Sequence, residues 1–247
     1  MLQSLQDLFS FVFNFSLLSD YGMRFVYGVL MTLKVVCVSC TIGFFLGYLV
    51  ALARMSKSIV LSSLALVYIT FFRGTPLLCQ LYIIYYGAGE IRPQLQDIGV
   101  WTLFRDAYFC CILSFTMNTA AYQAEILRGA ITSVSRGQRE AAMALGLTRF
   151  QTGRLVVLPQ ALLIALRPLG NEFISIIKAS SLASLVTLLD LMGQTRLVFA
   201  RTFDFSAYLY AAIIYLIMVE AIRRAWNRIE GRLSRHVRGR DVATGSV

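Results

Sequence analysis

The sequence predicts an all-α polytopic membrane protein with a core of five transmembrane helices. Of the 247 residues, 57% are hydrophobic and only 15% are charged, and the mean hydropathy is +0.68. Soluble domains usually carry about 25% charged residues, so an ordinary water-soluble globule is excluded. Because a helix needs about 20 apolar residues to cross a bilayer, the chain has room for about four to six spans and for no large soluble domain.

The N-terminal segment, residues 1–23, contains no Lys or Arg and therefore lacks the basic region of a cleaved signal peptide. Its apolar residues recur at helical spacing between polar ones, which predicts an amphipathic helix on the outer membrane face. Residues 24–222 form the predicted transmembrane domain. Its first span covers residues 26–53, where Lys34 is the only charge.

The second apolar stretch, residues 59–88, carries a single charge, Arg73, near its middle. Gly74 and Pro76 follow closely, and both residue types weaken a helix. We therefore expect a broken or kinked helix that lines a passage.

Four segments follow in order. Residues 90–106 are polar and form the predicted external loop, and the uncharged residues 107–124 form the third span. Residues 125–154 are polar, with five arginines, and form a predicted cytoplasmic segment. The fourth span, residues 160–177, is interrupted by charged and polar residues.

The chain ends with a short apolar segment, a span and a basic tail. Residues 179–189 are apolar but too short to cross a bilayer, so they are expected to be re-entrant or interfacial. The fifth span covers residues 205–219, and residues 223–247 form a basic cytoplasmic tail.

The distribution of basic residues predicts the orientation. Fourteen of the 23 Lys and Arg residues fall in the turn after the first span, in residues 125–154 and in the tail, against five in the opposite segments. Basic loops stay cytoplasmic, so the N-terminus is expected outside and the C-terminus inside. The same rule explains the net charge of +10, and no nucleic-acid binding is expected. With one histidine, His236, in the tail and five cysteines in apolar stretches, neither a His-based metal site nor a His-dependent catalytic triad is expected.

One cytoplasmic segment, about residues 136–159, has a distinctive pattern. It reads EAAMALG at residues 140–146, followed nine residues later by VVLP. Alanine, methionine and leucine favour a helix, and Gly146 is expected to end it in the left-handed conformation. Thr148 is expected to cap a second short helix, and Pro159 to start the next span. From these features alone the segment is either a docking surface or an interhelical linker.

The spacing EAA-x3-G-x9-V-x-LP resembles the EAA signature of the membrane subunits of ABC importers. Further stretches resemble the polar amino acid permease family, with its histidine, arginine, ornithine and opine branch as the nearest match. They include RGTP at residues 73–76, NTAAY at residues 118–122 and Asn171-Glu172. The resemblance covers about residues 22–230.

The resemblance implies the fold of a type I ABC importer permease. It also implies that separate subunits hydrolyse ATP and deliver the substrate. Such permease subunits pair on two cytoplasmic ATPase subunits, and a periplasmic solute-binding protein delivers the substrate. The second permease is expected to be a paralogue, with an identical copy as the alternative. ATPase coupling is assigned by the resemblance to Glu140, Ala141, Ala142 and Gly146. The sequence lacks a G-x4-GK[ST] loop, so ATP and Mg²⁺ are expected on the partner, with no cofactor and no catalytic residue in this chain.

Ionisable residues at membrane depth are candidates for the substrate pathway. A lone charge there costs from about 2.5 kcal/mol, so Arg73, Arg167 and Glu172 are expected to face a cavity or one another. Glu172 could bind a substrate guanidinium or ammonium group through a charge-assisted hydrogen bond. For Arg73 the alternative is a structural ion pair, and for Arg167 a position near the inner interface. Asn118, Thr119 and Tyr122 are secondary candidates, for which interhelical hydrogen bonding is the alternative.

The sequence thus predicts a multi-pass protein of the bacterial inner membrane that is not itself an enzyme. It would import polar, basic amino acids (arginine, ornithine or histidine) or opines by alternating access. The alternative is a stand-alone ion-coupled secondary amino acid transporter, which predicts inverted internal repeats that the sequence does not show. An intramembrane enzyme would need paired His or Asp residues within the spans, and the predicted spans contain none.

Overall fold

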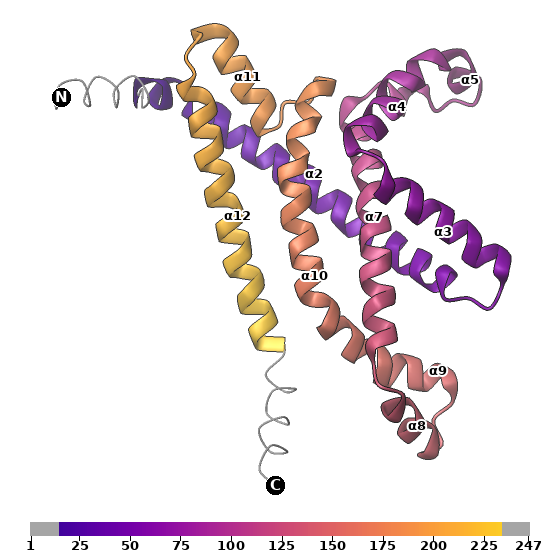
Figure 1. Ribbon diagram of the computed structural model, residues 1–247. Coiled ribbons are helices and arrows are strands. Elements are labelled where there is room, and N and C mark those ends of the chain that lie inside the picture. Colours follow the sequence, from indigo (N-terminus) through magenta and orange to yellow (C-terminus); the bar gives the residue numbers. More distant parts are fainter. Residues whose placement is uncertain (1–14, 234–247) are drawn as a thin grey trace. The chain divides into compact units, whose positions relative to one another are not determined.

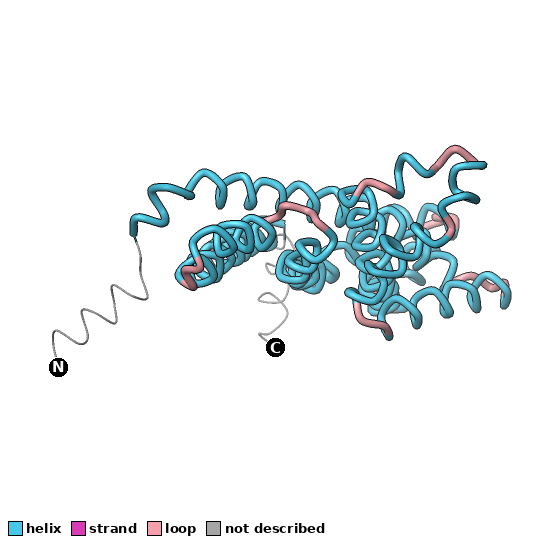
Figure 2. The backbone as a smooth tube through the Cα atoms, turned by 90° about the horizontal axis from the view of Figure 1, so that it is seen from above, coloured by secondary structure: helices cyan, strands magenta, loops and turns pink. Residues whose placement is uncertain are grey.

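The computed structural model describes residues 15–233, and all regular structure in this range is helical (Figures 1 and 2). The all-α prediction is therefore confirmed. In chain order the helices are α2 (Phe15–Arg54), α3 (Ile59–Gly74), α4 (Leu77–Glu90), α5 (Arg92–Asp97), α6 (Trp101–Phe104), α7 (Ala107–Ser133), α8 (Arg136–Ala144), α9 (Arg149–Thr152), the π-helix η1 (Gly153–Val157), α10 (Leu158–Ala179), the 3-10 helix η2 (Ser180–Val186), α11 (Leu191–Thr202) and α12 (Ser206–Leu233).

Three helical stretches within residues 15–233 are long and apolar enough to cross a membrane, namely Ser16–Arg54, Arg149–Val186 and Ser206–Leu233. The pair α3 and α4 is a fourth candidate, as one broken span. The expected third span lies in α7, whose 27 residues exceed the length that a span needs. Helix α7 itself is not among the candidate stretches of residues 15–233, and it contains polar side chains such as Asn118. Five spans and their orientation remain predictions.

The predicted break in the second apolar stretch is confirmed. Helix α3 ends at Gly74, and α4 begins at Leu77, directly after Pro76. Pro76 has an extended backbone, with φ −62° and ψ 134°. Proline cannot donate the hydrogen bond that would join the two helices, so the chain leaves the helical path here.

The two segments that flank the predicted transmembrane domain lie only partly within the described residues. Residues 1–14 of the expected N-terminal amphipathic segment lie outside them, and residues 15–23 are the first turns of α2. Helix α12 continues to Leu233, so residues 223–233 of the expected tail are helical. The remainder of the tail, including His236, lies outside the described range.

The chain forms two compact units. Within the described range, the first comprises residues 15–41, 75–116 and 175–220, and the second comprises residues 42–74, 117–174 and 221–233. Both units draw on several segments that are far apart in the sequence.

In the first unit, α2 and α11 approach closely. A Cβ atom at Gly28 would lie only 2.7 Å from the Cα atom of Leu191, so a larger residue does not fit there. The hydroxyl of Thr32 accepts a hydrogen bond from the Leu191 N–H at 3.1 Å. The buried carboxylate of Asp190 caps α11 and also accepts a hydrogen bond from the Tyr215 hydroxyl at 3.3 Å. These contacts hold α2, α11 and α12 together within this unit.

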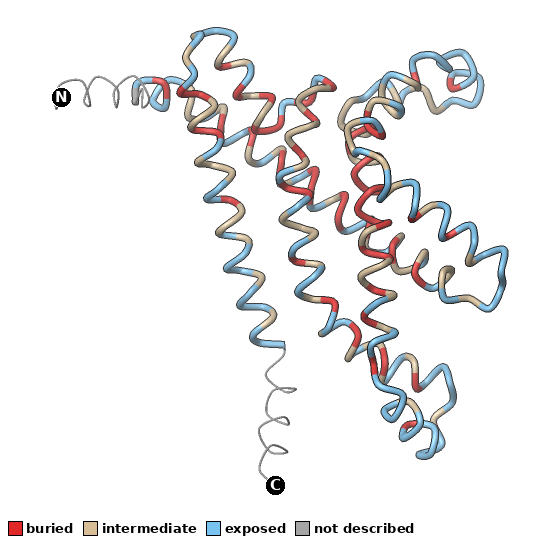
Figure 3. The backbone as a smooth tube through the Cα atoms, in the orientation of Figure 1, coloured by how far each residue is buried: buried red, intermediate tan, exposed pale blue. Residues whose placement is uncertain are grey.

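The second unit has a core of small apolar side chains, which lets its helices approach closely. A Cβ atom at Gly47 would lie 2.8 Å from the Ala120 carbonyl oxygen, so α2 and α7 nearly touch along their backbones. Buried positions follow α7 and α10, whereas most of α3 is exposed (Figure 3). The buried core residues are Ala51, Ile69, Ala124, Leu127, Ala130, Val134, Val157, Ala161 and Ala165.

Helix α10 stays continuous through Pro168, although the sequence suggests a weakened helix there. A tertiary contact with α12 lies at this part of the helix. A Cβ atom at Gly170 would lie 2.6 Å from Cδ1 of Trp226, so the glycine makes room for the indole ring. The indole N–H donates a hydrogen bond to the Leu166 carbonyl at 2.8 Å, and the ring stacks on Phe173. Contacts from α12 therefore support the part of α10 that local propensity favours least.

Candidate functional site

The predicted coupling residues lie on α8 and in the turn that follows it, in the second unit (Figure 1). Gly146 has a φ of +83°, which confirms the predicted left-handed end of this helix. The N–H of Gly146 donates to the Met143 carbonyl at 2.9 Å, and the N–H of Leu147 donates to the Ala142 carbonyl at 3.2 Å. This pair of hydrogen bonds is the Schellman motif, in which a residue with positive φ closes the helix.

A second short helix follows at once, as predicted. The Thr148 hydroxyl accepts a hydrogen bond from the Gln151 N–H, and the Gln151 side chain accepts one from the Thr148 N–H, which completes a capping box at the start of α9. Pro159, however, does not begin a separate span. The chain is helical without interruption from Arg149 through η1 into α10. The π-helical turns of η1 directly before Pro159 accommodate a residue that cannot donate a hydrogen bond within the helix.

The two alanines of the predicted coupling motif differ in exposure. Glu140 and Ala141 are exposed, whereas Ala142 is 4% exposed and packs into this chain. Leu145 and Phe150 flank the turn and are 84% and 76% exposed. Neither of these two apolar residues was predicted from the sequence as part of the coupling surface. Their position on either side of the Gly146 cap was the signal that could have identified them.

The structure brings the predicted pathway residues Thr119 and Glu172 into direct contact. The Thr119 hydroxyl on α7 donates a hydrogen bond to the half-buried Glu172 carboxylate on α10 at 3.1 Å. The Gln123 side-chain amide donates to the same hydroxyl at 3.0 Å. Gln123 was not predicted, although its spacing of four residues from Thr119 places both on one face of a helix. These three side chains form a polar cluster between α7 and α10.

The other predicted residues connect α7 to the end of α3. The Asn118 amide donates a hydrogen bond to the Phe72 carbonyl at 3.0 Å. The Arg73 guanidinium lies over the Tyr122 ring, 5.2 Å from its centroid, which is a cation–π contact. Its positive charge also acts electrostatically on the Glu172 carboxylate. Asn118 and Tyr122 therefore face α3, whereas Thr119 faces α10.

Arg167 has a different partner from the other candidates. Its guanidinium forms an ion pair with Glu230 of α12, with an N–O distance of 2.9 Å. The Arg167 side chain is 71% exposed, whereas the Glu230 side chain is 21% exposed. A structural pairing of α10 with α12 accounts for this residue.

The arrangement can bind a polar ligand. A carboxylate, a guanidinium, an aromatic ring, a hydroxyl and two amides meet at the end of α3 and on the facing parts of α7 and α10. The Arg73 guanidinium and the Glu172 carboxylate give this region opposite charges, which suit a ligand that itself carries both charges.

Comparison with known proteins agrees with this description. Residues 43–235 match the family described as "Binding-protein-dependent transport system inner membrane component". The chain is 41% identical to the nopaline transport system permease protein NocM of Agrobacterium fabrum over 210 residues, which are 85% of this chain and 87% of NocM.

Two further curated relatives differ in the substrate for which they are named. The arginine ABC transporter permease protein ArtM of Haemophilus influenzae is 37% identical over 81% of this chain and 87% of its own length. The L-cystine transport system permease protein TcyL of Bacillus subtilis is 35% identical over 82% of this chain and 84% of its own length.

Among solved structures, the fold is similar to that of a chain in the crystal structure of an amino acid ABC transporter with histidines. The TM-score is 0.77 and the identity 35%, over 87% of this chain and 96% of that chain. The family is one of transport permeases and not of enzymes. This chain is a multi-pass membrane protein that belongs to the inner-membrane components of binding-protein-dependent transport systems, among the permease subunits of amino acid ABC importers.

Proposed function

We propose that this chain is the permease subunit of an ATP-driven importer of basic amino acids or opines in the bacterial inner membrane. The relatives named for nopaline and arginine support this substrate class. The relative named for L-cystine makes cystine the competing substrate. Transport would proceed by alternating access, in which ATP hydrolysis on a partner biases two states of the helix bundle.

The observation that carries the proposal is the polar cluster around Glu172. A half-buried carboxylate with a hydroxyl donor at 3.1 Å can also accept from a guanidinium or ammonium group of a substrate. Arg73, at the break between α3 and α4, supplies the opposite charge for a substrate carboxylate. Both charges lie on the second unit, and Arg73 is exposed, so a ligand can reach it.

The proposed partners follow from the exposed end of the same unit. Ala141 and Glu140 present a low, polar surface on α8, with Leu145 and Phe150 beside it. We assign this surface to one of two ATPase subunits, which would bind ATP and Mg²⁺. A second permease, a paralogue in preference to an identical copy, and a periplasmic solute-binding protein would complete the importer.

Reconstitution into liposomes tests the proposal. With the ATPase, the second permease and the binding protein present, we expect ATP-dependent accumulation of radiolabelled arginine, ornithine, nopaline or octopine. Uptake of cystine alone would refute the substrate class. Ion-driven uptake by this chain without ATP or partners would instead establish the stand-alone secondary transporter.

A further inference from the structure

Two adjoining cavities lie beside α8 and α9 in the second unit, away from the polar cluster of Glu172. The larger has a volume of about 610 Å³ and the smaller about 390 Å³. They share Ile131, Arg149, Gly153 and Val157, so they lie next to each other. Neither is part of the proposed pathway, and the larger one shares only Phe150 with the surface assigned to the ATPase.

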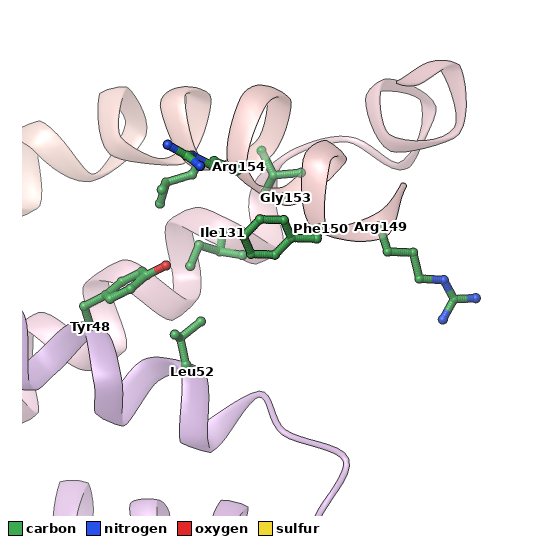
Figure 4. Close-up of a pocket in the computed structure, with 9 residues that line it drawn as sticks. Tyr48, Leu52, Ile131, Arg149, Phe150, Gly153 and Arg154 are labelled. Atoms are coloured by element: carbon green, nitrogen blue, oxygen red, sulfur yellow. The ribbon is translucent and has the colours of Figure 1, made fainter. Parts of the chain in front are cut away.

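The larger cavity is mainly apolar. Figure 4 shows the Phe150 ring directed toward Tyr48, with Ile131 and Leu52 beside it. Val157 and Leu158 complete the apolar lining. These side chains come from α2, α7, α9, η1 and α10, and they suit a flexible hydrocarbon chain.

The smaller cavity also has an apolar part, but two arginines and a threonine give it polar, positively charged groups. It is lined by Arg139, Arg149 and Thr152, with Met143 beside them. Thr152 is 5% exposed, and its hydroxyl is a buried group with no hydrogen-bond partner among the described residues. The Nε atom of Arg139 is also buried and has no hydrogen-bond partner among the described residues. Another nitrogen of the same guanidinium donates to the Ile131 carbonyl. Buried donors without acceptors are costly, and two of them beside a second arginine indicate an anionic ligand.

We propose that this space holds one anionic phospholipid. Its phosphate would accept hydrogen bonds from Arg139 and Thr152 and pair with Arg149, while an acyl chain would fill the larger cavity. Arginines beside a large apolar lining match the headgroup and the acyl chain of such a lipid, and a soluble phosphate would leave the apolar lining without a contact. The inference rests on the proposed function in one respect, since that function places α8 on the cytoplasmic side, where basic pockets meet anionic headgroups.

Two variants test the site, one by filling its space and one by removing a positive charge. Gly153 lines both cavities and has helical backbone angles, and an added Cβ meets no atom within 4 Å, so Gly153→Leu places a side chain in this space. Arg149→Gln removes the charge. The matched controls are Gly129→Leu, at a glycine of α7 that also has open space, and Arg201→Gln, at an exposed arginine of α11. Neither control residue lines a cavity.

The measurement is native mass spectrometry of the complete transporter, delipidated and then titrated with phosphatidylglycerol or phosphatidylethanolamine. We expect one retained phosphatidylglycerol for each copy of this chain and little phosphatidylethanolamine. Retention should fall about fivefold or more in Gly153→Leu and Arg149→Gln, and the controls should match the wild type.

Three outcomes would overturn the proposal. The first is equal retention in the wild type and both cavity variants. The second is displacement of the lipid by inorganic phosphate at millimolar concentration. The third is loss of subunit assembly in the cavity variants without any specific lipid in the wild type, which would assign the space to a partner chain. Lipid retention is read without transport, so failed amino acid uptake by a complex that still binds phosphatidylglycerol refutes only the proposed function.

Discussion

Glu172 owes its environment to side chains from two other segments of the second unit. Thr119 of α7 donates to its carboxylate, and the charge of Arg73 acts on it from the end of α3. Neither contact is local in sequence. A carboxylate held in this way keeps its position without being sequestered in a close ion pair, which leaves it able to bind a cationic group.

We predict that Glu172→Gln reduces the initial rate of arginine uptake about tenfold or more, because a hydrogen bond to a charged group contributes about 1.5–3 kcal/mol. The measurement is radiolabelled uptake by the complete importer at equal protein levels. Glu230→Gln is the matched control, since this carboxylate of the same unit pairs with Arg167. Equal rates for Glu172→Gln and the wild type would exclude the binding role.

Gly146 has a φ of +83°, which is a strained conformation for any residue with a Cβ. Gly146→Val should destabilise the cap by about 1–2 kcal/mol and expose the amides of α8. Hydrogen exchange over residues 136–152 measures this change. Gly137→Ala, within α8 and with open space around it, should leave exchange unchanged or slower. Unchanged exchange in Gly146→Val would show that the cap does not hold the turn.

At the scale of the element, α8 presents two faces. Ala142 contacts this chain, and Ala141 is exposed. Ala141→Arg should therefore abolish co-purification of the ATPase while leaving the thermal stability of the chain unchanged. Ala142→Arg should lower the stability as well, because it buries a charge. If Ala141→Arg still co-purifies with the ATPase and supports uptake, α8 is not the docking helix.

The contact between α10 and α12 is also a property of elements. Gly170→Ala should lower stability by about 1–3 kcal/mol, since the added Cβ overlaps the Trp226 indole and forces it to move. Thermal unfolding of the purified complex measures the effect, and Gly129→Ala is the control with open space. In a chain that also carries Trp226→Ala, Gly170→Ala should lower the stability much less. An equal cost in both backgrounds would contradict the steric explanation.

At the scale of the whole molecule, the candidate pathway and the candidate coupling segment belong to the same compact unit. Arg139 of α8 donates to the carbonyl of Ile131 near the end of α7, and α7 carries Thr119 and Tyr122 further up. A displacement of α8 by an ATPase can therefore reach the pathway through a continuous helix.

This connection gives a prediction for the assembled importer. Arg139→Gln should retain the ATPase, because the exposed face of α8 is unchanged, but should reduce ATP-driven uptake. The comparison is substrate accumulated per ATP hydrolysed in proteoliposomes, for the variant and the wild type. Uptake per ATP equal to that of the wild type would show that this hydrogen bond does not transmit motion.

The sequence by itself determined the helical class, the family and the local signals of the coupling segment. Hydropathy, the break at Gly74 and Pro76, the Gly146 cap and the Thr148 capping box all depend on residues within one or two helical turns, so spacing reveals them. The tertiary structure alone decided which side chains meet and which are buried. Arg167 pairs with Glu230, Thr119 donates to Glu172, and Ala142 is buried while Ala141 is exposed. Those outcomes depend on helices that are distant in sequence, as does the continuity of α10 past Pro168, because packing and buried hydrogen bonds override local propensity.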